Sequence, residues 1–248
     1  MIETATALPQ ALGDLVRDHA ATQPDVAAFT FGDENLTFGE LDTGSNRAAQ
    51  GLTALGVGKG DRVAYLGKNH PLYFEVLIAA AKLGAVMTPV NWRLAPPEVA
   101  YIVNDCQAKV LFVGEGFAGM LDKVRGDFAH VSTVIGIDAG GADGTDYRQW
   151  RDGFSASDPL VEIAPDDDAL QLYTSGTTGR PTGAVMTHGS IISSRRQSDL
   201  GDEADLKDWQ KPIPGEVTLL AMPCFHISGT GTGIGTIAAG TRNIFEIL

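Results

Sequence analysis

The sequence has few cysteines and far fewer basic than acidic residues. Its 248 residues include two cysteines, Cys106 and Cys224, which form no CxxC pair, so neither a disulfide framework nor a zinc cluster is indicated. Eighteen lysines and arginines against 31 aspartates and glutamates give a net charge of −13. A surface of this sign repels phosphate backbones. We therefore expect no nonspecific nucleic-acid binding, and the cysteine content fits a reducing cytoplasm.

Long apolar runs are missing as well. The N-terminus shows no basic start followed by an apolar stretch, and the longest largely apolar stretch, Val76 to Val90, is interrupted by Lys82 and Gly84. We expect neither a signal peptide nor a membrane span, and a cytoplasmic protein. With 44% hydrophobic and 20% charged residues the chain can build a sizeable core, which excludes a disordered tail or linker.

Helix-like and strand-like stretches alternate along the first two-thirds of the chain, which is typical of an α/β fold. Thr37 and Glu40 have the spacing of a capping box, and Pro71 stands where a helix often begins. We predict helices over 38–55 and from Pro71 up to Gly84, and strands over 62–66, 86–90, 110–113, 134–137, 170–173 and 217–222. The strand, helix and strand over 62–90 favour mostly parallel sheets flanked by helices.

The composition changes between Asp158 and Asp168, where five acidic residues and two prolines occur without a basic residue. Such a stretch is typical of a solvated connector. We place a boundary here and expect a first α/β subdomain over 1–163 and a second, incomplete one over 164–248.

The strongest chemical signal follows the strand predicted over 170–173. Residues 174–183 read TSGTTGRPTG, with five hydroxyl side chains and three glycines. Glycines let backbone N–H groups turn toward an anion, and hydroxyls add short donors, so the composition suits phosphate. An exposed Ser/Thr/Gly turn is the alternative interpretation. The spacing is not that of a Walker A loop, and no GxSxG hydrolase motif surrounds Ser175 or Ser228.

The segment from Tyr173 to Gly183 resembles the signature loop of the AMP-forming adenylate synthetases, a family of acyl-CoA synthetases, luciferases and peptide-synthetase adenylation domains. The family reads roughly YTSGTTGxPKG, and nine of ten fixed positions match. Four further segments resemble the family in the same order, over 36–41, 56–63, 81–94 and 223–229. The FHxxG form over 225–229 is more similar to acyl-CoA synthetases than to amino-acid-adenylating domains. The resemblance implies the N-terminal portion of the large domain of such an enzyme and a fatty or other organic carboxylic acid as substrate.

The resemblance also implies a reaction and its residues. The loop would close over the β- and γ-phosphates of ATP, with the Thr174 hydroxyl near magnesium. The acid's carboxylate would attack the α-phosphate, giving an acyl-adenylate and pyrophosphate, and the thiol of coenzyme A would then displace AMP. His226 would line the acyl pocket beside the reacting carboxylate. The residues assigned to the nucleotide are Thr174, Ser175, Gly176, Thr177, Thr178, Gly179, Arg180 and Thr182.

The sequence departs from the family in two ways. The loop lysine is Thr182 here, and Arg180 either supplies the missing charge from another angle or is a plain surface residue. The 248 residues are about half the family's length, so we expect them to be inactive alone. A degenerate module that only binds a ligand or partner, and an amino-acid-adenylating domain, remain as alternatives.

Other patterns have structural interpretations. Residues 233–238 fit a GxGxxA dinucleotide spacing, but close helix packing through small residues is the better account. His188 is expected to begin the helix after the loop. We expect Trp92, Trp150 and Trp209 to be core or interface anchors.

Overall fold

The computed structural model describes residues 9–138, 145–174, 180–199 and 215–245, without side chains over 194–199. Its helices are α1 (Leu12–Thr22), α2 (Phe38–Ala54), α3 (Pro71–Leu83), α4 (Pro96–Asp105), α5 (Ala118–Val124), the short 3-10 helix η1 (Arg125–Asp127), α6 (Tyr147–Asp152), α7 (His188–Asp199) and α8 (Ile227–Ala239). Its strands are β1 (Ala27–Phe31), β2 (Glu34–Thr37), β3 (Arg62–Leu66), β4 (Val86–Val90), β5 (Ala108–Val113), β6 (Thr133–Gly136), β7 (Asp168–Thr174), β8 (Thr182–Thr187), β9 (Val217–Leu220) and β10 (Arg242–Phe245).

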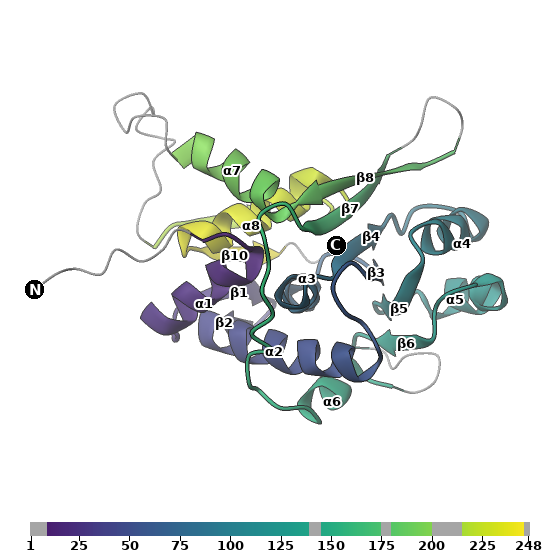
Figure 1. Ribbon diagram of the computed structural model, residues 1–248, viewed down its shortest axis with the longest axis horizontal. Helices are drawn as coiled ribbons and strands as arrows, with labels where there is room; N and C mark the ends of the chain where they lie inside the picture. Colours follow the sequence, from purple (N-terminus) through teal and green to yellow (C-terminus); the bar gives the residue numbers. More distant parts are fainter. Residues whose placement is uncertain (1–8, 139–144, 175–179, 200–214, 246–248) are drawn as a thin grey trace, which may run out of the picture.

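The strands form two sheets. A six-stranded sheet has the order β6-β5-β3-β4-β7-β8, and a four-stranded sheet has the order β2-β1-β10-β9. Neighbouring strands are parallel except in the pairs β7–β8 and β1–β2. The expected α/β fold with mostly parallel sheets flanked by helices is confirmed (Figure 1).

The two central helices have the ends that the sequence predicts. Thr37 caps α2: its hydroxyl accepts from Glu40 N (3.2 Å), and the Glu40 carboxylate accepts from Thr37 N (2.9 Å). Pro71 is the first residue of α3, and Gly84 ends this helix with φ at 68°, a backbone conformation that glycine adopts without strain. All 13 residues of α3 are buried, so this helix lies inside the molecule.

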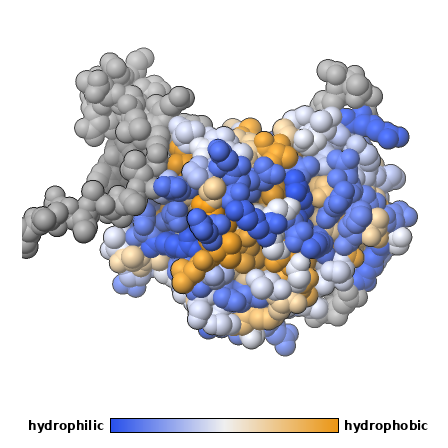
Figure 2. Space-filling model, viewed as in Figure 1, coloured by the Kyte–Doolittle hydropathy of each residue, from blue (hydrophilic) through white to orange (hydrophobic). Residues whose placement is uncertain are grey.

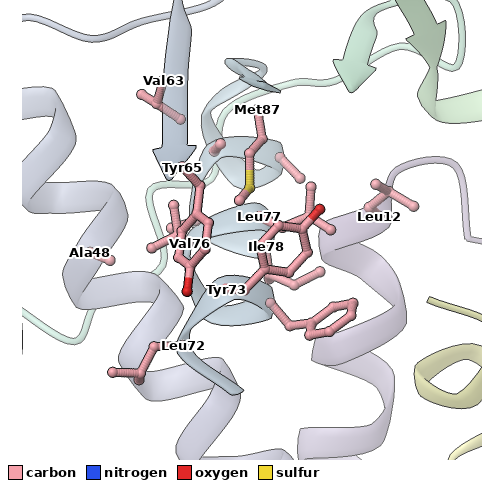
Figure 3. Packing of buried hydrophobic residues seen from close by; sticks show 14 of the residues in the cluster. Leu12, Ala48, Val63, Tyr65, Leu72, Tyr73, Val76, Leu77, Ile78 and Met87 are labelled. Atoms are coloured by element: carbon pink, nitrogen blue, oxygen red, sulfur yellow. The ribbon is translucent and has the colours of Figure 1, made fainter. Parts of the chain in front are cut away.

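Helix α3 joins the two sheets through one hydrophobic core. On one side, the Phe74 ring stacks on Phe29 of β1 at 4.8 Å, and Phe245 of β10 packs against both rings. On the other side, α3 packs against Tyr65 and Met87 of the six-stranded sheet (Figure 3). A second apolar cluster fills the opposite face of that sheet beneath α4 and α5. The six-stranded sheet is thus covered on both faces, as parallel sheets usually are.

Two buried charges of α3 are paired with its neighbours. Lys82 Nζ donates to Asp42 Oδ1 and Asn46 Oδ1 of α2, both at 2.6 Å. Glu75 Oε1 accepts from Arg151 (2.7 Å) and from the hydroxyl of Tyr147 (2.8 Å), both in α6. Burial lowers the pKa of Lys82 and raises that of Glu75. These pairs join α2 and α6 to α3. Removing one partner would leave a buried charge without its ion pair, which is costly.

The segment between α6 and β7 crosses the face of the molecule shown in Figure 1. It carries two exposed apolar residues, Leu160 and Val161. Polar residues cover much of this face, with apolar residues gathered in patches between them (Figure 2). Both sheets take strands from either side of this segment. The division into 1–163 and 164–248 stays a prediction.

No helix in the described part of the chain combines the length and the apolar character needed to cross a membrane.

Candidate functional site at the carboxyl edge of the sheet

The hairpin of β7 and β8 ends in two exposed threonines. Thr174 and Thr182 form the last pair of its antiparallel ladder, so their side chains stand where the two strands part. Arg180 is also exposed, and its guanidinium carbon lies 5.9 Å from the centre of the Tyr101 ring in α4. The structure thus brings together three of the residues assigned to the nucleotide. The others, Ser175, Gly176, Thr177, Thr178 and Gly179, lie outside the described residues.

Gly183 is the last residue of the hydroxyl-rich segment over 174–183, and the packing of neighbouring side chains requires a glycine here. It pairs with Tyr173 across the hairpin. A β-carbon at this position would lie 2.5 Å from Gln171 Nε2 and 3.0 Å from Tyr173 Cζ. Because residue 183 has no β-carbon, the side chains of Gln171 and Tyr173 can pack directly against the backbone of β8. Gln171 is buried and donates to the Tyr173 hydroxyl at 3.1 Å.

A cavity of about 710 Å³ lies at the carboxyl edge of the six-stranded sheet. It is lined by residues at the ends of four neighbouring parallel strands, β3 to β6, and by two residues that follow β9. The lining contains both aromatic and charged side chains, among them Tyr65, Lys68, Trp92, Arg93, Glu115, Phe117 and Asp138. Since β7 is parallel to β4, the end of β7 with Thr174 lies at the same edge. Crevices outside the carboxyl ends of parallel strands are the usual ligand sites of α/β sheets.

One wall of this cavity joins two motifs that are about 130 residues apart in the sequence. The Trp92 ring meets Phe225 edge-on at 6.2 Å. The Arg93 guanidinium carbon lies 4.8 Å from the Trp92 ring centre and 5.7 Å from that of Phe225. His226 is exposed at the N-cap of α8, with its ring 4.5 Å from Phe225. His226 therefore stands beside this wall, although it does not line the cavity.

The segment before α8 is held by an asparagine and a glycine. Asn69 Nδ2 donates to Met222 O (2.9 Å), and Asn69 Oδ1 accepts from Cys224 N (2.8 Å). A β-carbon at Gly229 would overlap the carbonyl of Pro223, so the glycine of the FHxxG form permits the tight turn into α8. Main-chain contacts thereby place His226 and Phe225.

Comparisons with known proteins place the chain in a family. The family model described as AMP-binding enzyme matches residues 16–246. A fatty acid–acyl-carrier-protein ligase, ScoC of Streptomyces coeruleorubidus, is 36% identical over 90% of this chain and 41% of its own length. The long-chain-fatty-acid–CoA ligase FadD13 of Mycobacterium tuberculosis is 36% identical over 94% of this chain and 44% of its own length. The chain belongs to the AMP-binding enzyme family.

Solved structures give the same result for the fold. The N-terminal domain of FACL13 from Mycobacterium tuberculosis, an inhibitor-bound crystal structure, superposes with a TM-score of 0.82 at 34% identity. The match covers 95% of this chain and 57% of that one. The chain spans about two-fifths of the length of the curated relatives it matches and resembles their N-terminal part.

Contacts within this family member explain two sequence interpretations. The small residues over 233–238 serve helix packing, since a β-carbon at Gly233 of α8 would overlap the Phe74 ring of α3. His188 begins α7, as expected. The sequence analysis assigned no role to the cavity residues Lys68 and Arg93, although Arg93 lies in the family-like segment over 81–94. They come together because β3 and β4 are neighbours in the sheet, and the order of strands cannot be read from a local motif.

Proposed function

We propose that this chain is the N-terminal part of an AMP-forming ligase that joins an organic carboxylic acid to the thiol of coenzyme A. The observation that carries the proposal is the shared edge of the six-stranded sheet. The hydroxyl-bearing end of the hairpin and the 710 Å³ cavity both lie at the carboxyl ends of parallel strands. A nucleotide at the hairpin and an organic substrate in the cavity can therefore meet along one edge.

ATP fits the hairpin end by its chemistry. Thr174 and Thr182 offer exposed hydroxyls, and Arg180 offers a cation next to them in the sequence. Magnesium suits these residues as well, because it is usually held by few protein oxygens together with substrate phosphates and water. Within the described residues, no group of three or more His, Cys, Asp or Glu side chains forms a protein-built metal cage. We assign the Thr174 hydroxyl to this ion, which would neutralise phosphate charge when bound.

The cavity fits coenzyme A better than a fatty chain. A fatty chain favours an uninterrupted apolar lining, whereas this lining carries Lys68, Arg93, Glu115 and Asp138 among its rings. Coenzyme A combines phosphates with an adenine ring and a long, partly polar arm. Basic side chains and aromatic faces are the groups that recognise these parts. The acid's carboxylate would then lie near His226, beside Phe225, whose ring packs against Trp92 of the cavity lining.

The reaction has two steps that balance. A carboxylate oxygen of the acid attacks the α-phosphorus of ATP, the bond to the β-phosphate oxygen breaks, and acyl-AMP and pyrophosphate form. The sulfur of coenzyme A then attacks the acyl carbon, AMP leaves with the electron pair of the broken bond, and the thiol proton is released. The FHxxG form favours a fatty acid or another organic carboxylic acid as the substrate.

The test separates the two steps. In the complete encoded protein, exchange of labelled pyrophosphate into ATP should depend on an added carboxylic acid. Arg93→Ala should raise the KM for coenzyme A roughly tenfold or more, because hydrogen bonds to charged groups are worth about 1.5 to 3 kcal/mol, and should leave the exchange rate unchanged. Lys123→Ala, which removes an exposed charge of α5 away from the cavity, is the control.

Absence of exchange with any fatty, aromatic or amino acid would reject the ligase and leave the binding module. Exchange with amino acids alone would establish the amino-acid-adenylating alternative.

A further inference from the structure

Asn69 connects the two sheets beside the 710 Å³ cavity. It lies in the loop between β3 of the six-stranded sheet and α3, and its amide reaches the segment that follows β9 of the four-stranded sheet. Its Nδ2 donates to Met222 O at 2.9 Å, and its Oδ1 accepts from Cys224 N at 2.8 Å. Both polar atoms of this side chain are thus bonded to the main chain of the segment.

The segment is also held from the inside of the molecule. The hydroxyls of Tyr73 and Thr230 both donate to Cys224 O, at 3.0 and 2.5 Å. These two residues are fully buried, whereas Asn69 is half-buried and belongs to neither apolar cluster. The segment therefore has an inner contact, which is part of the core, and an outer contact at Asn69, which lies outside both clusters.

The segment held in this way carries two parts of the proposed site. Ala221 and Pro223 line the cavity, as does Asn69 itself. His226 N donates to Pro223 O at 3.1 Å, so the position of this histidine depends on the position of the segment. A displacement of the segment would move the cavity wall and His226 together.

We propose that Asn69 is a positioning residue that fixes the coenzyme A cavity and the acyl site at His226 relative to each other. The inference rests on the proposed function, which assigns both sites. Asn69 acts through the main chain of 221–226. Thr174 and Thr182 lie on the hairpin of β7 and β8, outside this segment, so the use of ATP should be affected least.

The amide fixes the segment through two directional bonds. A site whose groups are already in place binds its ligand without first having to order them. Loss of the amide leaves Met222 O and Cys224 N to water, while the inner contact at Cys224 O remains. We therefore expect a folded protein whose segment over 221–226 is less well positioned.

Asn104 offers a matched control. Its amide makes the same kind of bridge, since it donates to Asp127 O and accepts from Ala129 N, both at 2.8 Å, and Asn104 is also half-buried. Neither Asn104 nor its two partners line the cavity. Asn104→Ala therefore removes the same pair of bonds at a place where no effect on a substrate is expected.

The test compares kinetic constants of the complete encoded protein. Asn69→Ala should raise the KM for coenzyme A and the KM for the acid about tenfold each, an effect within the range of two hydrogen bonds. The KM for ATP in pyrophosphate exchange should stay within about twofold, and so should all three KM values of Asn104→Ala. Asn69→Asp keeps the size of the side chain but places a carboxylate oxygen against Met222 O. It should therefore not restore the two constants, whereas a role in packing alone would be restored.

Hydrogen exchange measures the positioning without any substrate. In the 248-residue chain, the amide of Cys224 should exchange faster in Asn69→Ala than in the unsubstituted protein and should be unchanged in Asn104→Ala. An unchanged rate in both variants would show that Asn69 does not hold the segment, whatever the enzyme activity.

The outcomes separate the two proposals. An unsubstituted protein that forms no acyl-CoA with any acid overturns the proposed function and, with it, this role of Asn69. An active unsubstituted protein in which Asn69→Ala changes none of the three KM values, or all three alike, overturns the positioning role alone. Where Asn69→Ala does not fold, Asn69→Ser replaces it and is judged by the same constants.

Discussion

His188 is a buried histidine that joins the first residue of α1 to the start of α7. Its Nδ1 accepts a hydrogen bond from Leu12 N at 3.2 Å, and its side chain is fully buried. The proton of the neutral ring is therefore on Nε2, which has no partner among the described residues. Burial lowers the pKa of His188 to about 4, from 6.5 in an exposed chain.

We expect this histidine to make the protein less stable in acid. Because the folded pKa lies below the unfolded one, the unfolded state takes up a proton first as the pH falls below 6.5. The contribution of His188 is thus complete above pH 6.5 and is lost progressively down to about pH 4. It amounts to about 3 kcal/mol, at about 1.4 kcal/mol per pH unit.

Urea unfolding of the unsubstituted chain and of His188→Gln at several pH values measures this effect. The glutamine does not titrate, so the stability difference between the two proteins should shrink or reverse as the pH falls. The effects of the other titrating groups, which both proteins share, cancel in this difference. A difference that stays constant from neutral pH to about pH 4 would mean that His188 is not the group responsible.

Thr182 stands where the family has a lysine, and it is exposed opposite Thr174. Thr182→Lys should tighten the binding of magnesium-ATP roughly tenfold to a hundredfold, because a hydrogen bond from an ammonium to phosphate is worth about 1.5 to 3 kcal/mol. The Arg180 guanidinium rests over Tyr101, so Arg180→Ala alone should weaken binding much less.

Calorimetry on the two single variants and the double variant decides this question. If Arg180 already provides the loop's positive charge, the result reverses: Arg180→Ala becomes damaging and the added lysine brings no gain. Unchanged binding in all three variants would show that neither position contacts phosphate.

Among the contacts between elements, that between α8 and α3 depends on the absence of a side chain at Gly233. A β-carbon at Gly233 would overlap the Phe74 ring. Gly233→Ala should therefore destabilise the protein by about 1 to 3 kcal/mol through overpacking, despite the better helix propensity of alanine. Gly119→Ala is the control: Gly119 lies in α5, where a β-carbon meets nothing within 4 Å.

Urea unfolding of both variants measures the difference. The control should be unchanged or more stable by up to about 1 kcal/mol. Equal stability of the two variants would show that Phe74 moves aside at little cost.

Several elements with local signals were predicted, and some elements that depend on distant partners were missed. The predicted strands over 62–66 and 86–90 coincide with β3 and β4, because buried parallel strands read as short apolar runs. Strands β1 and β10 were missed: each is short, and they pair through Phe29 and Asn243, about 200 residues apart. Strand β8 was hidden because its first residues belong to the glycine-rich motif.

The candidate site divides in the same way. Thr174, Arg180 and Thr182 lie within one local motif, so the sequence alone could place them together. The cavity could not be predicted, because Trp92 and Phe225 meet only after β4 and α8 are packed. The sequence analysis predicted Trp92 as a core or interface anchor but did not predict its contact with Phe225.

At the scale of the whole molecule, both sheets share one core around α3. The six-stranded sheet needs β7 and β8 from the second part of the chain, and the four-stranded sheet needs β1 and β2 from the first. We therefore expect one cooperative unfolding transition. Circular dichroism and tryptophan fluorescence should give the same midpoint, whereas two separated transitions would indicate that 1–163 and 164–248 unfold independently.

The last prediction concerns what this chain can do by itself. Those residues assigned to the reaction that the structure describes are exposed: Thr174, Arg180, Thr182 and His226 all contact solvent. Electrostatic stabilisation of a transition state is strong in a site from which water is excluded, and a positioned set of groups loses most of its effect when members are absent. The curated relatives are more than twice as long as the part this chain matches.

We therefore expect the isolated 248 residues to form neither acyl-AMP nor acyl-CoA at an appreciable rate, even where they bind magnesium-ATP. The measurement is chromatography of acyl-AMP, AMP and acyl-CoA after incubation with ATP, magnesium, coenzyme A and a panel of fatty and aromatic acids. Turnover on the order of 1 per second or more would mean that the hairpin, the cavity and His226 form a working site without further protein. Magnesium-ATP binding without turnover would agree with a nucleotide site that other protein groups must enclose before the carboxylate can react.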